Sequence, residues 1–273
     1  MTNTRRHPLR ARFALVLLLL ATCFGVGCSR GADSKRLRVG IMSGGEEQIA
    51  AVAARIAKER HGLDVELVTF SDYLMPNAAL ADGSLDANAF QHAPFLSQQI
   101  EARQYRLAIV ASTFIYPIAG YSQRLRSLGD LKDGAQVAVP NDPSNLGRAL
   151  KLLEHSGLLE LRAEAGILAS VLDITKNPRG LRIVELDAAQ LPRVLPDVDL
   201  AIINNNYAAQ AGLAALRDGI LVESKDSPYV NLIVAREDNK GDPRIAQWVA
   251  SYQTEEVHQA ALGIFNGGVV KGW

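Results

Sequence analysis

Cysteine is nearly absent from this chain of 273 residues, and its two cysteines, Cys23 and Cys28, both lie close to the N-terminus. Disulfides and cysteine-based zinc sites are therefore excluded for everything after residue 28. The chain also lacks a large excess of either charge, because 29 lysines and arginines balance 29 aspartates and glutamates. Without a basic excess, nucleic acid is not an expected partner.

Common catalytic and nucleotide-binding motifs are missing as well. The patterns H-E-x-x-H, G-x-S-x-G and G-x-x-x-x-G-K-[ST] do not occur, and no two of the five histidines stand at metal-binding spacing. Glu46 and Glu47 fit better as acidic residues in the first turn of a helix than as catalytic carboxylates. We therefore expect no catalytic residue, no metal and no cofactor, and any ATP-driven work would fall to another chain.

The longest apolar run lies at the N-terminus and resembles an export signal. Residues 2–12 carry four arginines and no acidic residue, and residues 14–24 form an apolar core too short to span a bilayer comfortably. Small residues precede Cys28, as in bacterial lipoprotein signals, where the cysteine is lipidated and becomes the first mature residue. Cys23 is the alternative lipidation site, and an uncleaved membrane anchor would place the domain in the same compartment.

The remainder of the chain is long enough for two lobes. We predict a signal peptide over residues 1–27 and a lipidated tether over residues 28–36, which is mostly small and polar. Removal of residues 1–27 leaves 246 residues (273 − 27) with a formal charge of −4 (25 − 29), because all four leader charges are arginine. A chain of that length is large for one core.

From Leu37 onward, short segments rich in Val, Ile and Leu alternate with helical patterns. In the helix predicted over residues 43–62, Ser43 and Glu46 have capping-box spacing and Gly62 suits a C-terminal stop. Strands separated by helices predict an α/β fold with mostly parallel sheets. The predicted strands are residues 37–41, 63–70, 107–114, 136–140, 181–187, 198–205 and 229–236.

Two extended segments have the character of crossings between lobes. Residues 113–122 are apolar but broken by a proline and a glycine, and residues 227–236 form an extended run before the last helix. Two crossings imply a lobe made from the N-terminal part and the C-terminal tail, with a second lobe inserted and a cleft between them. We predict that lobe 1 comprises residues 37–115 plus 232–273 and that lobe 2 comprises residues 116–231.

The segment NDPSNLGR, residues 141–148, follows a predicted strand and starts a helix. Ser144 or Asn145 can cap this helix. The free N–H groups at its start would then face the carboxyl edge of the sheet, where α/β folds bind ligands. Arg148 lies three residues after Asn145, and its guanidinium fork suits a carboxylate. A surface arginine on an ordinary capped helix is the alternative interpretation.

Polar or aromatic residues follow several other predicted strands. Asparagine can accept from an ammonium and donate to a carboxylate, and aromatic rings can enclose an apolar or sulfur-bearing side chain. The alternatives are that Phe90 and Phe95 belong to the core, that the single histidine is structural and that the run Asn204 to Asn206 is a turn. These candidates are Phe70, Tyr73, Phe90, Gln91, His92, Phe95, Asn204, Asn205, Asn206, Tyr207, Tyr229 and Asn231.

Seven motifs run in order through nearly the whole predicted mature chain: LDVELVTFSDYLMPN, LDANAFQHAPFL, TFIYPIAGYS, QVAVPNDPSNLGRAL, QLPRVLPDVDLAIIN, SPYVNLIVAREDN and FNGGVVKGW. With these motifs the sequence resembles the MetQ-type methionine-binding lipoproteins of the NlpA lipoprotein family, the substrate-binding components of bacterial methionine ABC importers. The combination of NDPSNLGR with SPYVNLIV is highly specific. The resemblance implies a two-lobed periplasmic-binding-protein fold, in agreement with the two predicted crossings.

The resemblance also implies roles for nine residues. Arg148 would clamp the ligand carboxylate, and Asn145, Asn204 and Asn231 would hold the amino-acid head group. The side-chain pocket would be lined by Phe70, Tyr73, Phe90, His92 and Tyr116. The family usually has Asn-Thr-Thr-Tyr where this chain has Asn-Asn-Asn-Tyr, so the roles of Asn205 and Asn206 stay open.

The implied function is transport rather than catalysis. The protein would capture L-methionine in the cleft and deliver it to the permease and ATPase subunits of an ABC importer. Its lipid anchor would hold it to a membrane of the cell envelope, facing the periplasm or the exterior. D-methionine, a methionine-containing dipeptide and another amino acid are alternative ligands. A hydrolase that used His92 would need a nucleophile or metal that the sequence does not offer.

Overall fold

The computed structural model describes residues 1–2 and 35–273, and residues 35–273 lie within one compact unit. The predicted signal peptide beyond residue 2, both candidate lipidation sites and most of the predicted tether lie outside the described residues. Among the described residues, every helix is too short or too polar to span a bilayer.

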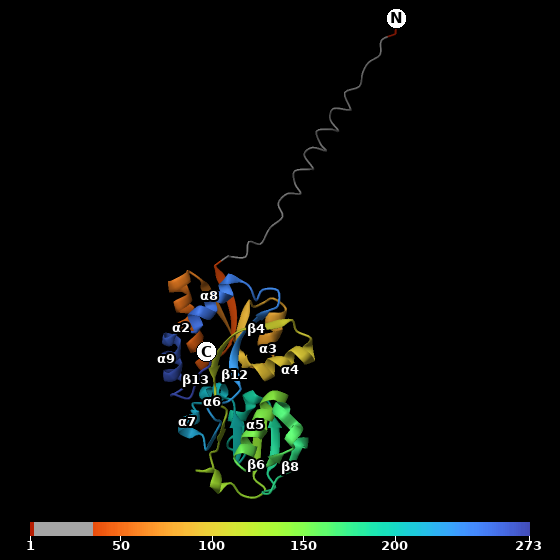
Figure 1. The fold of residues 1–273 in the computed structure, drawn as a ribbon, viewed down its shortest axis with the longest axis vertical. Helices are drawn as coiled ribbons and strands as arrows, with labels where there is room; N and C mark the ends of the chain where they lie inside the picture. The colour runs from red at the N-terminus through yellow and green to blue at the C-terminus, as the bar shows by residue number, and fades with distance from the viewer. Residues whose placement is uncertain (3–34) are drawn as a thin grey trace. The chain divides into compact units, whose positions relative to one another are not determined.

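Two large sheets form the framework of residues 35–273 (Figure 1). In spatial order, the six-stranded sheet contains β13 (Val270–Lys271), β4 (Leu107–Ile115), β12 (Val230–Arg236), β3 (Ala87–His92), β1 (Arg36–Met42) and β2 (Asp64–Phe70). The five-stranded sheet contains β11 (Leu221–Val222), β5 (Ala119–Tyr121), β10 (Leu200–Ile203), β6 (Gln136–Pro140) and β9 (Arg182–Leu186). A two-stranded sheet pairs β7 (Glu160–Leu161) with β8 (Ile174–Lys176).

Both large sheets are mixed, so the expectation of mostly parallel sheets is wrong. β1 runs parallel to β2 and β3, and β6 runs parallel to β9 and β10. The other five pairings within these sheets are antiparallel. β5 and β12 enter their sheets directly from the other sheet, without the crossover helix that usually precedes a parallel strand, and both run antiparallel to their neighbours.

All seven predicted strands are present, with ends displaced by two residues at most. β3 was not predicted, because its sequence ANAFQH mixes small, polar and aromatic residues although every side chain is buried. Its polar residues satisfy one another in a buried network. Asn88 Nδ2 donates to Asn77 Oδ1 at 2.9 Å, and Asn77 Nδ2 donates to Gln91 Oε1 at 2.7 Å.

Helices cover both faces of the six-stranded sheet (Figure 1). The α-helices are α2 (Gly45–His61), α3 (Met75–Ala81), α4 (Ala93–Arg103), α5 (Pro143–His155), α6 (Asn205–Gln210), α7 (Ala215–Asp218), α8 (Pro243–Tyr252) and α9 (Glu255–Ile264). In β12, Ile233 packs into the cluster shared with α2, α8 and α9, while Leu232 and Val234 pack toward α3 and α4. This alternation follows from the two-residue repeat of a strand. The 3-10 helices are η1 (Leu128–Asp130), η2 (Ala163–Leu168), η3 (Val171–Asp173) and η4 (Ala188–Val194).

The start of α2 differs from the prediction. The helix begins at Gly45, after Gly44 with a φ of 94°, and the Gly44 N–H donates to Glu47 Oε2 at 3.4 Å. The predicted capping box of Ser43 and Glu46 is therefore wrong, and the side chain of Glu46 is buried. Gly62 ends the helix in the left-handed conformation, as predicted.

The chain crosses from one sheet to the other twice. It leaves the six-stranded sheet between β4 and β5, and it returns between β11 and β12. The predicted lobe boundary at 115/116 coincides with the end of β4. The predicted boundary at 231/232 falls inside β12, whose pairing with β4 begins at Val230 and Ile115. The lobe ranges themselves remain a prediction.

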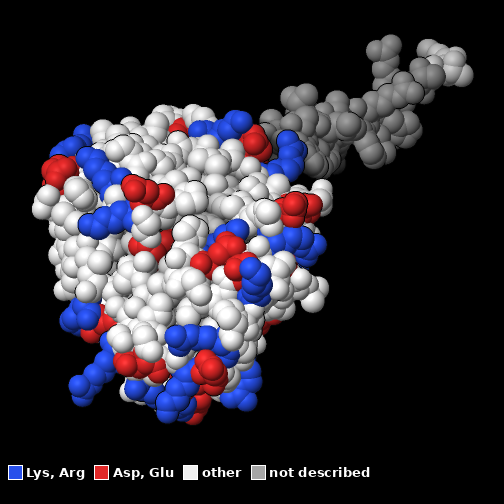
Figure 2. Space-filling view, turned by 60° about the horizontal axis from the view of Figure 1, so that its bottom comes forward, with Lys and Arg blue, Asp and Glu red and all other residues white. Residues whose placement is uncertain are grey.

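Surface charges are mixed in sign on the face shown in Figure 2. Exposed ion pairs such as Lys58–Asp64 and Lys176–Glu160 leave more than half of each side chain in solvent. Such pairs contribute only about 0–1 kcal/mol each. The stability of the fold therefore rests on its buried clusters rather than on surface charge.

Candidate functional site

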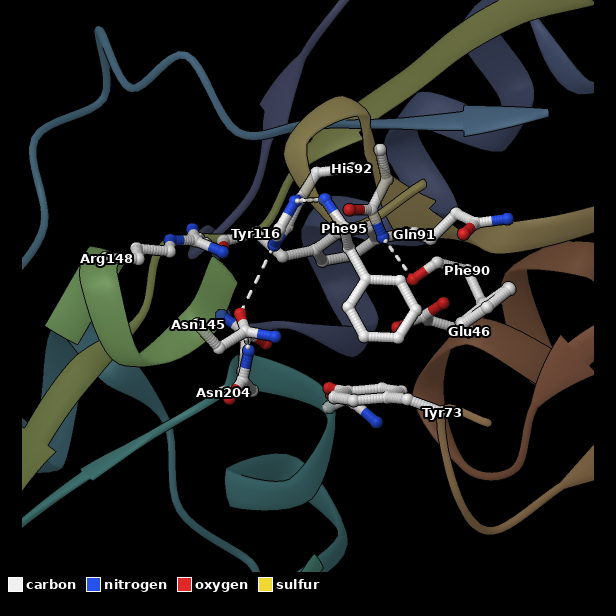
Figure 3. Close-up of a pocket in the computed structure, with 13 residues that line it drawn as sticks. Glu46, Tyr73, Phe90, Gln91, His92, Phe95, Tyr116, Asn145, Arg148 and Asn204 are labelled. Atoms are coloured by element: carbon white, nitrogen blue, oxygen red, sulfur yellow. Dashed lines mark hydrogen bonds between the residues drawn. The ribbon is translucent and has the colours of Figure 1, made fainter. Parts of the chain in front are cut away.

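One pocket brings together residues from both large sheets (Figure 3). It holds about 380 Å³ of empty space, counting the part open to solvent. Eight of the nine predicted ligand-binding residues line it: Tyr73, Phe90, His92, Tyr116, Asn145, Arg148, Asn204 and Asn231.

The pocket forms where strand ends, a helix start and a crossing meet. Phe90 and His92 end β3, and Asn145 and Arg148 belong to the first turns of α5. Asn204 directly follows β10. Because these elements end at the junction between the two sheets, residues more than a hundred positions apart line the same cavity.

Phe70 does not line the pocket. Its ring is partly buried and packs against two hydrophobic clusters, one of which contains Phe90 and the other Leu80 and Leu85. Its nearest ring carbon would lie 3.2 Å from a Cβ at Gly40. Phe70 therefore packs as part of the hydrophobic core rather than as a wall of the pocket.

Five residues outside the predicted set also line the pocket: Glu46, Gln91, Phe95, Asn205 and Asn206. Gln91 and Phe95 are among the sequence candidates, although they lie outside the seven predicted strands, and the sequence assigns no role to Asn205 and Asn206. Glu46 was interpreted only as a helix-start charge. Its position just after β1, at the carboxyl edge of the sheet, is the signal that could have identified it.

The side chain of Asn145 is occupied by neighbouring residues. Asp142 caps α5 by accepting from the Asn145 backbone N–H at 3.0 Å, so the prediction of Ser144 or Asn145 as the cap is wrong. Asp142 also accepts from Asn145 Nδ2 at 2.9 and 3.1 Å. Asn145 Oδ1 accepts from Asn204 Nδ2 at 2.8 Å. Asn145 therefore fixes the orientation of Asn204.

His92 is held in one neutral form. Its Nδ1 accepts from the Phe95 backbone N–H at 3.2 Å at the start of α4, so the hydrogen resides on Nε2. Nε2 then donates to Asn145 Oδ1 at 3.2 Å. Burial, and next the positive charge of Arg148, lower the pKa of His92 to about 3. Both ring nitrogens are thus committed to positioning neighbours.

Arg148 is 4% exposed and reaches the pocket from α5. Its Nε donates to Glu223 Oε1 at 2.9 Å, and its Nη2 donates to Glu223 Oε2 at 2.5 Å and to the Tyr116 carbonyl at 2.9 Å. The guanidinium carbon lies 4.5 Å from the centroid of the Tyr229 ring. Within residues 35–273, Nη1 has no hydrogen-bond partner, so this donor remains for a ligand.

Other polar atoms around the pocket also lack partners. Within residues 35–273, no hydrogen bond satisfies the buried Asn204 Oδ1 or Asn206 Nδ2. Asn231 Nδ2 donates to the Phe90 carbonyl at 2.9 Å, which leaves its Oδ1 to act as an acceptor. Buried polar groups are normally satisfied. A small ligand that carries both donors and acceptors would supply the missing bonds.

Three aromatic rings form an apolar side of the pocket. The Tyr73, Phe90 and Phe95 ring centroids lie 5.9–6.1 Å apart. Such a group of rings can enclose an apolar or sulfur-bearing chain. The pocket therefore combines a polar region near Arg148 with an aromatic region near Phe95 (Figure 3).

Hydrogen bonds also join the two halves of the fold beside the pocket. The Tyr73 hydroxyl donates to Asn206 Oδ1, and the Tyr207 hydroxyl donates to the Ser71 carbonyl at 3.2 Å. Gln210 Nε2 donates to the Ser43 carbonyl at 2.9 Å. In each bond, a residue of α6 meets a loop that follows a strand of the six-stranded sheet, so these bonds join the two halves beside the pocket.

Comparison with known proteins places these features in a family. The family model described as "NlpA lipoprotein" matches residues 37–273. The D-methionine-binding lipoprotein MetQ of Salmonella typhimurium is 55% identical over 264 residues, covering 96% of this chain and 97% of that protein. Among solved structures, a periplasmic substrate-binding protein of an ABC transporter from Coxiella burnetii is 50% identical with a TM-score of 0.84, covering 86% of this chain and 100% of its own. A nutrient-binding protein from Burkholderia cenocepacia bound to methionine is 47% identical with a TM-score of 0.85, covering 87% and 100%.

Proposed function

The chain belongs to the NlpA lipoprotein family, and from this premise we propose that it is an extracytoplasmic substrate-binding lipoprotein that captures methionine between two lobes for an ABC importer. The observation that carries the proposal is the combination, in one buried pocket, of unsatisfied donors and acceptors with an aromatic wall. The methionine in the B. cenocepacia relative and the transporter assignment of the C. burnetii relative support it.

The polar atoms divide naturally between the two charges of an amino acid. Arg148 Nη1 and Asn206 Nδ2 are donors and would bind the carboxylate. Asn204 Oδ1 and Asn231 Oδ1 are acceptors and would bind the ammonium. Asn145 would hold the head group indirectly, through its hydrogen bond to Asn204.

The aromatic residues would enclose the thioether side chain. We propose that Tyr73, Phe90, His92 and Tyr116 contact it directly, because all four line the pocket. Phe70 would support this wall from behind, through the cluster that it shares with Phe90. Apolar and sulfur-bearing groups gain from contact with aromatic rings, which favours methionine over a polar amino acid.

Closure of the cleft is what would make binding tight. With nine non-hydrogen atoms and a ceiling of roughly 1.5 kcal/mol per atom, methionine could gain at most about 13 kcal/mol, near nanomolar affinity. Approaching this limit requires burial of nearly the whole ligand with every polar atom paired. The hydrogen bonds from Tyr73, Tyr207 and Gln210 across the cleft are suited to such a closed state.

The partners and location follow from the same proposal. The closed, loaded form would dock on the permease of the importer, and the ATPase subunits would drive release of the ligand. A lipid on Cys28 would hold the protein to a membrane, facing the periplasm or the exterior. We propose that the protein performs no catalysis and binds no metal or cofactor. His92, the histidine of the pocket, has both ring nitrogens engaged in structural hydrogen bonds.

Calorimetric titration of Ser29–Trp273 with L-methionine tests the proposal. The protein is first unfolded and refolded, because a tightly bound ligand would copurify and mask the site. We expect a one-to-one isotherm with a submicromolar dissociation constant. D-methionine, a methionine-containing dipeptide and leucine are titrated in parallel to separate the alternative ligands. A flat trace with every one of these ligands, from protein with native circular dichroism, would contradict the proposal.

A further inference from the structure

Glu46 has an environment that the proposed head-group contacts do not explain. It lies in the first turn of α2, lines the pocket and is 3% exposed. Within residues 35–273, its carboxyl group has no hydrogen-bond partner and no cationic neighbour, and burial alone raises its pKa well above the usual range. A carboxylate buried without a partner is costly, which favours the protonated form of the group.

A role as a first-turn charge of α2 does not explain why the side chain of Glu46 is buried. The neighbouring Glu47 already accepts from the Gly44 N–H at the start of α2. A first-turn charge acts through solvent or a free backbone N–H, and neither requires burial. The side chain of Glu46 instead lines the pocket that Phe90 and Phe95 also line (Figure 3).

The position of Glu46 in the pocket determines which part of a ligand it meets. Figure 3 shows Arg148 and Glu46 at opposite ends of the pocket. The ammonium of an α-amino acid is separated from its carboxylate by one carbon, so a carboxylate held by Arg148 keeps the ammonium near Asn204. Only the side chain of the ligand can extend to Glu46.

We propose that Glu46 is a specificity-determining residue, whose protonated carboxyl group donates a hydrogen bond to an acceptor atom in the ligand side chain. For methionine this acceptor is the thioether sulfur. The inference rests on the proposed function, because it takes an amino-acid carboxylate to lie at Arg148. Tyr73 and Tyr116 also line the pocket, and burial raises the pKa of both hydroxyls, so neither provides a competing charge.

An aliphatic analogue separates this role from simple packing. L-Norleucine has nearly the shape of methionine, but a methylene replaces the sulfur and cannot accept a hydrogen bond. Binding of norleucine leaves the buried O–H of Glu46 unpaired, whereas the thioether is a weak acceptor. A weak hydrogen bond of this kind corresponds to a preference for methionine of about threefold to fivefold.

The experiment compares dissociation constants for L-methionine and L-norleucine by calorimetry in wild type, Glu46→Leu and Glu46→Gln. In Glu46→Leu the preference for methionine is expected to fall by about threefold, because the donor is lost. In Glu46→Gln it should be kept to within about twofold, because the amide N–H can donate in place of the hydroxyl. Glu47→Gln, one residue along the same helix turn, is the matched control and should retain the wild-type preference.

Two results would overturn the proposal. One is an unchanged preference in a Glu46→Leu protein whose circular dichroism is native. The other result concerns the wild-type protein itself. If it binds norleucine as tightly as methionine, no group at this end of the pocket discriminates between the two side chains. Failure of the proposed function is distinguishable from both, since wild-type protein would then bind neither ligand.

Discussion

Arg148 and Glu223 form a largely buried bidentate ion pair, with Nε 2.9 Å from Oε1 and Nη2 2.5 Å from Oε2. Their side chains are 4% and 11% exposed. Glu223 lies in the second crossing between the sheets, and its Oε2 also accepts from the Ile118 N–H in the first crossing at 3.2 Å. One carboxylate thus connects both crossings to the arginine of the pocket, and it neutralises a charge that would otherwise be buried alone.

Replacement of Glu223 should destabilise the protein strongly. Glu223→Ala leaves the Arg148 guanidinium buried without a counter-ion, which typically costs about 3–5 kcal/mol of unfolding free energy. Urea unfolding at neutral pH measures the loss. Glu160→Ala is the matched control, because Glu160 pairs with Lys176 in solvent, and it should cost less than about 1 kcal/mol. Equal losses in the two variants would show that the buried pair has no special role.

Replacement of Asn231 should weaken methionine binding more than tenfold. The substitution Asn231→Ala removes the acceptor Oδ1 and would leave the ligand ammonium without one of its buried partners, at a cost of about 1.5–3 kcal/mol. It also removes the hydrogen bond to the Phe90 carbonyl. Calorimetric titration gives the change in dissociation constant. Asn177→Ala, in a turn that does not line the pocket, should leave the constant within about twofold of wild type. An unchanged affinity in Asn231→Ala would exclude the residue from the site.

His92 should make the protein less stable as the pH falls from about 6.5 toward about 3. In this window the unfolded chain binds a proton on His92 and the folded protein does not, so the unfolding free energy decreases with decreasing pH. Each such proton contributes a slope of up to about 1.4 kcal/mol per pH unit. Above about pH 7.5 the group is neutral in both states and the effect disappears.

The His92→Gln variant isolates this contribution from that of the carboxyl groups. Urea unfolding of both proteins at several pH values between about 4 and 7.5 should show a shallower pH dependence for the variant. Parallel curves for the two proteins would mean that His92 is protonated as easily in the folded state as in the unfolded state.

Gly147 should not tolerate a side chain, although it lies within a helix. A Cβ at this position would overlap the Ile167 carbonyl oxygen and approach the Ala169 backbone nitrogen to 2.9 Å. Because these are backbone atoms, Gly147→Ala must displace either η2 or the turn of α5 that carries Asn145 and Arg148. We expect a loss of about 1–3 kcal/mol in stability together with weaker methionine binding.

The control for this prediction is another helical glycine. A Cβ added to Gly263 in α9 would meet no heavy atom within 4 Å. Gly263→Ala should therefore stabilise the protein by about 0.5–1 kcal/mol and raise its melting temperature. If both alanine variants were stabilised equally, close packing between α5 and η2 would not constrain the site.

Local patterns predicted much of this fold. The seven predicted strands were recognised from short apolar runs, and the left-handed end of α2 from Gly62. β3 was missed because its asparagine and glutamine are satisfied by Asn77, a residue from a separate element. The cap of α5 was misassigned for a more local reason, since Asp142, Ser144 and Asn145 are all capping residue types and only the backbone geometry selects Asp142.

The sequence by itself determined the α/β architecture, the family and most of the residues around the pocket, because strand periodicity, turn chemistry and family motifs are local signals. Tertiary structure alone decided how those residues share their hydrogen bonds. Glu223 pairs with Arg148 across 75 positions, and Asn145 is occupied by Asp142, His92 and Asn204. Burial of Glu46 was likewise decided by packing around the pocket, since a first-turn glutamate is ordinarily solvated. Hydrogen-bond partners and burial depend on which distant segments meet, and no local pattern records that.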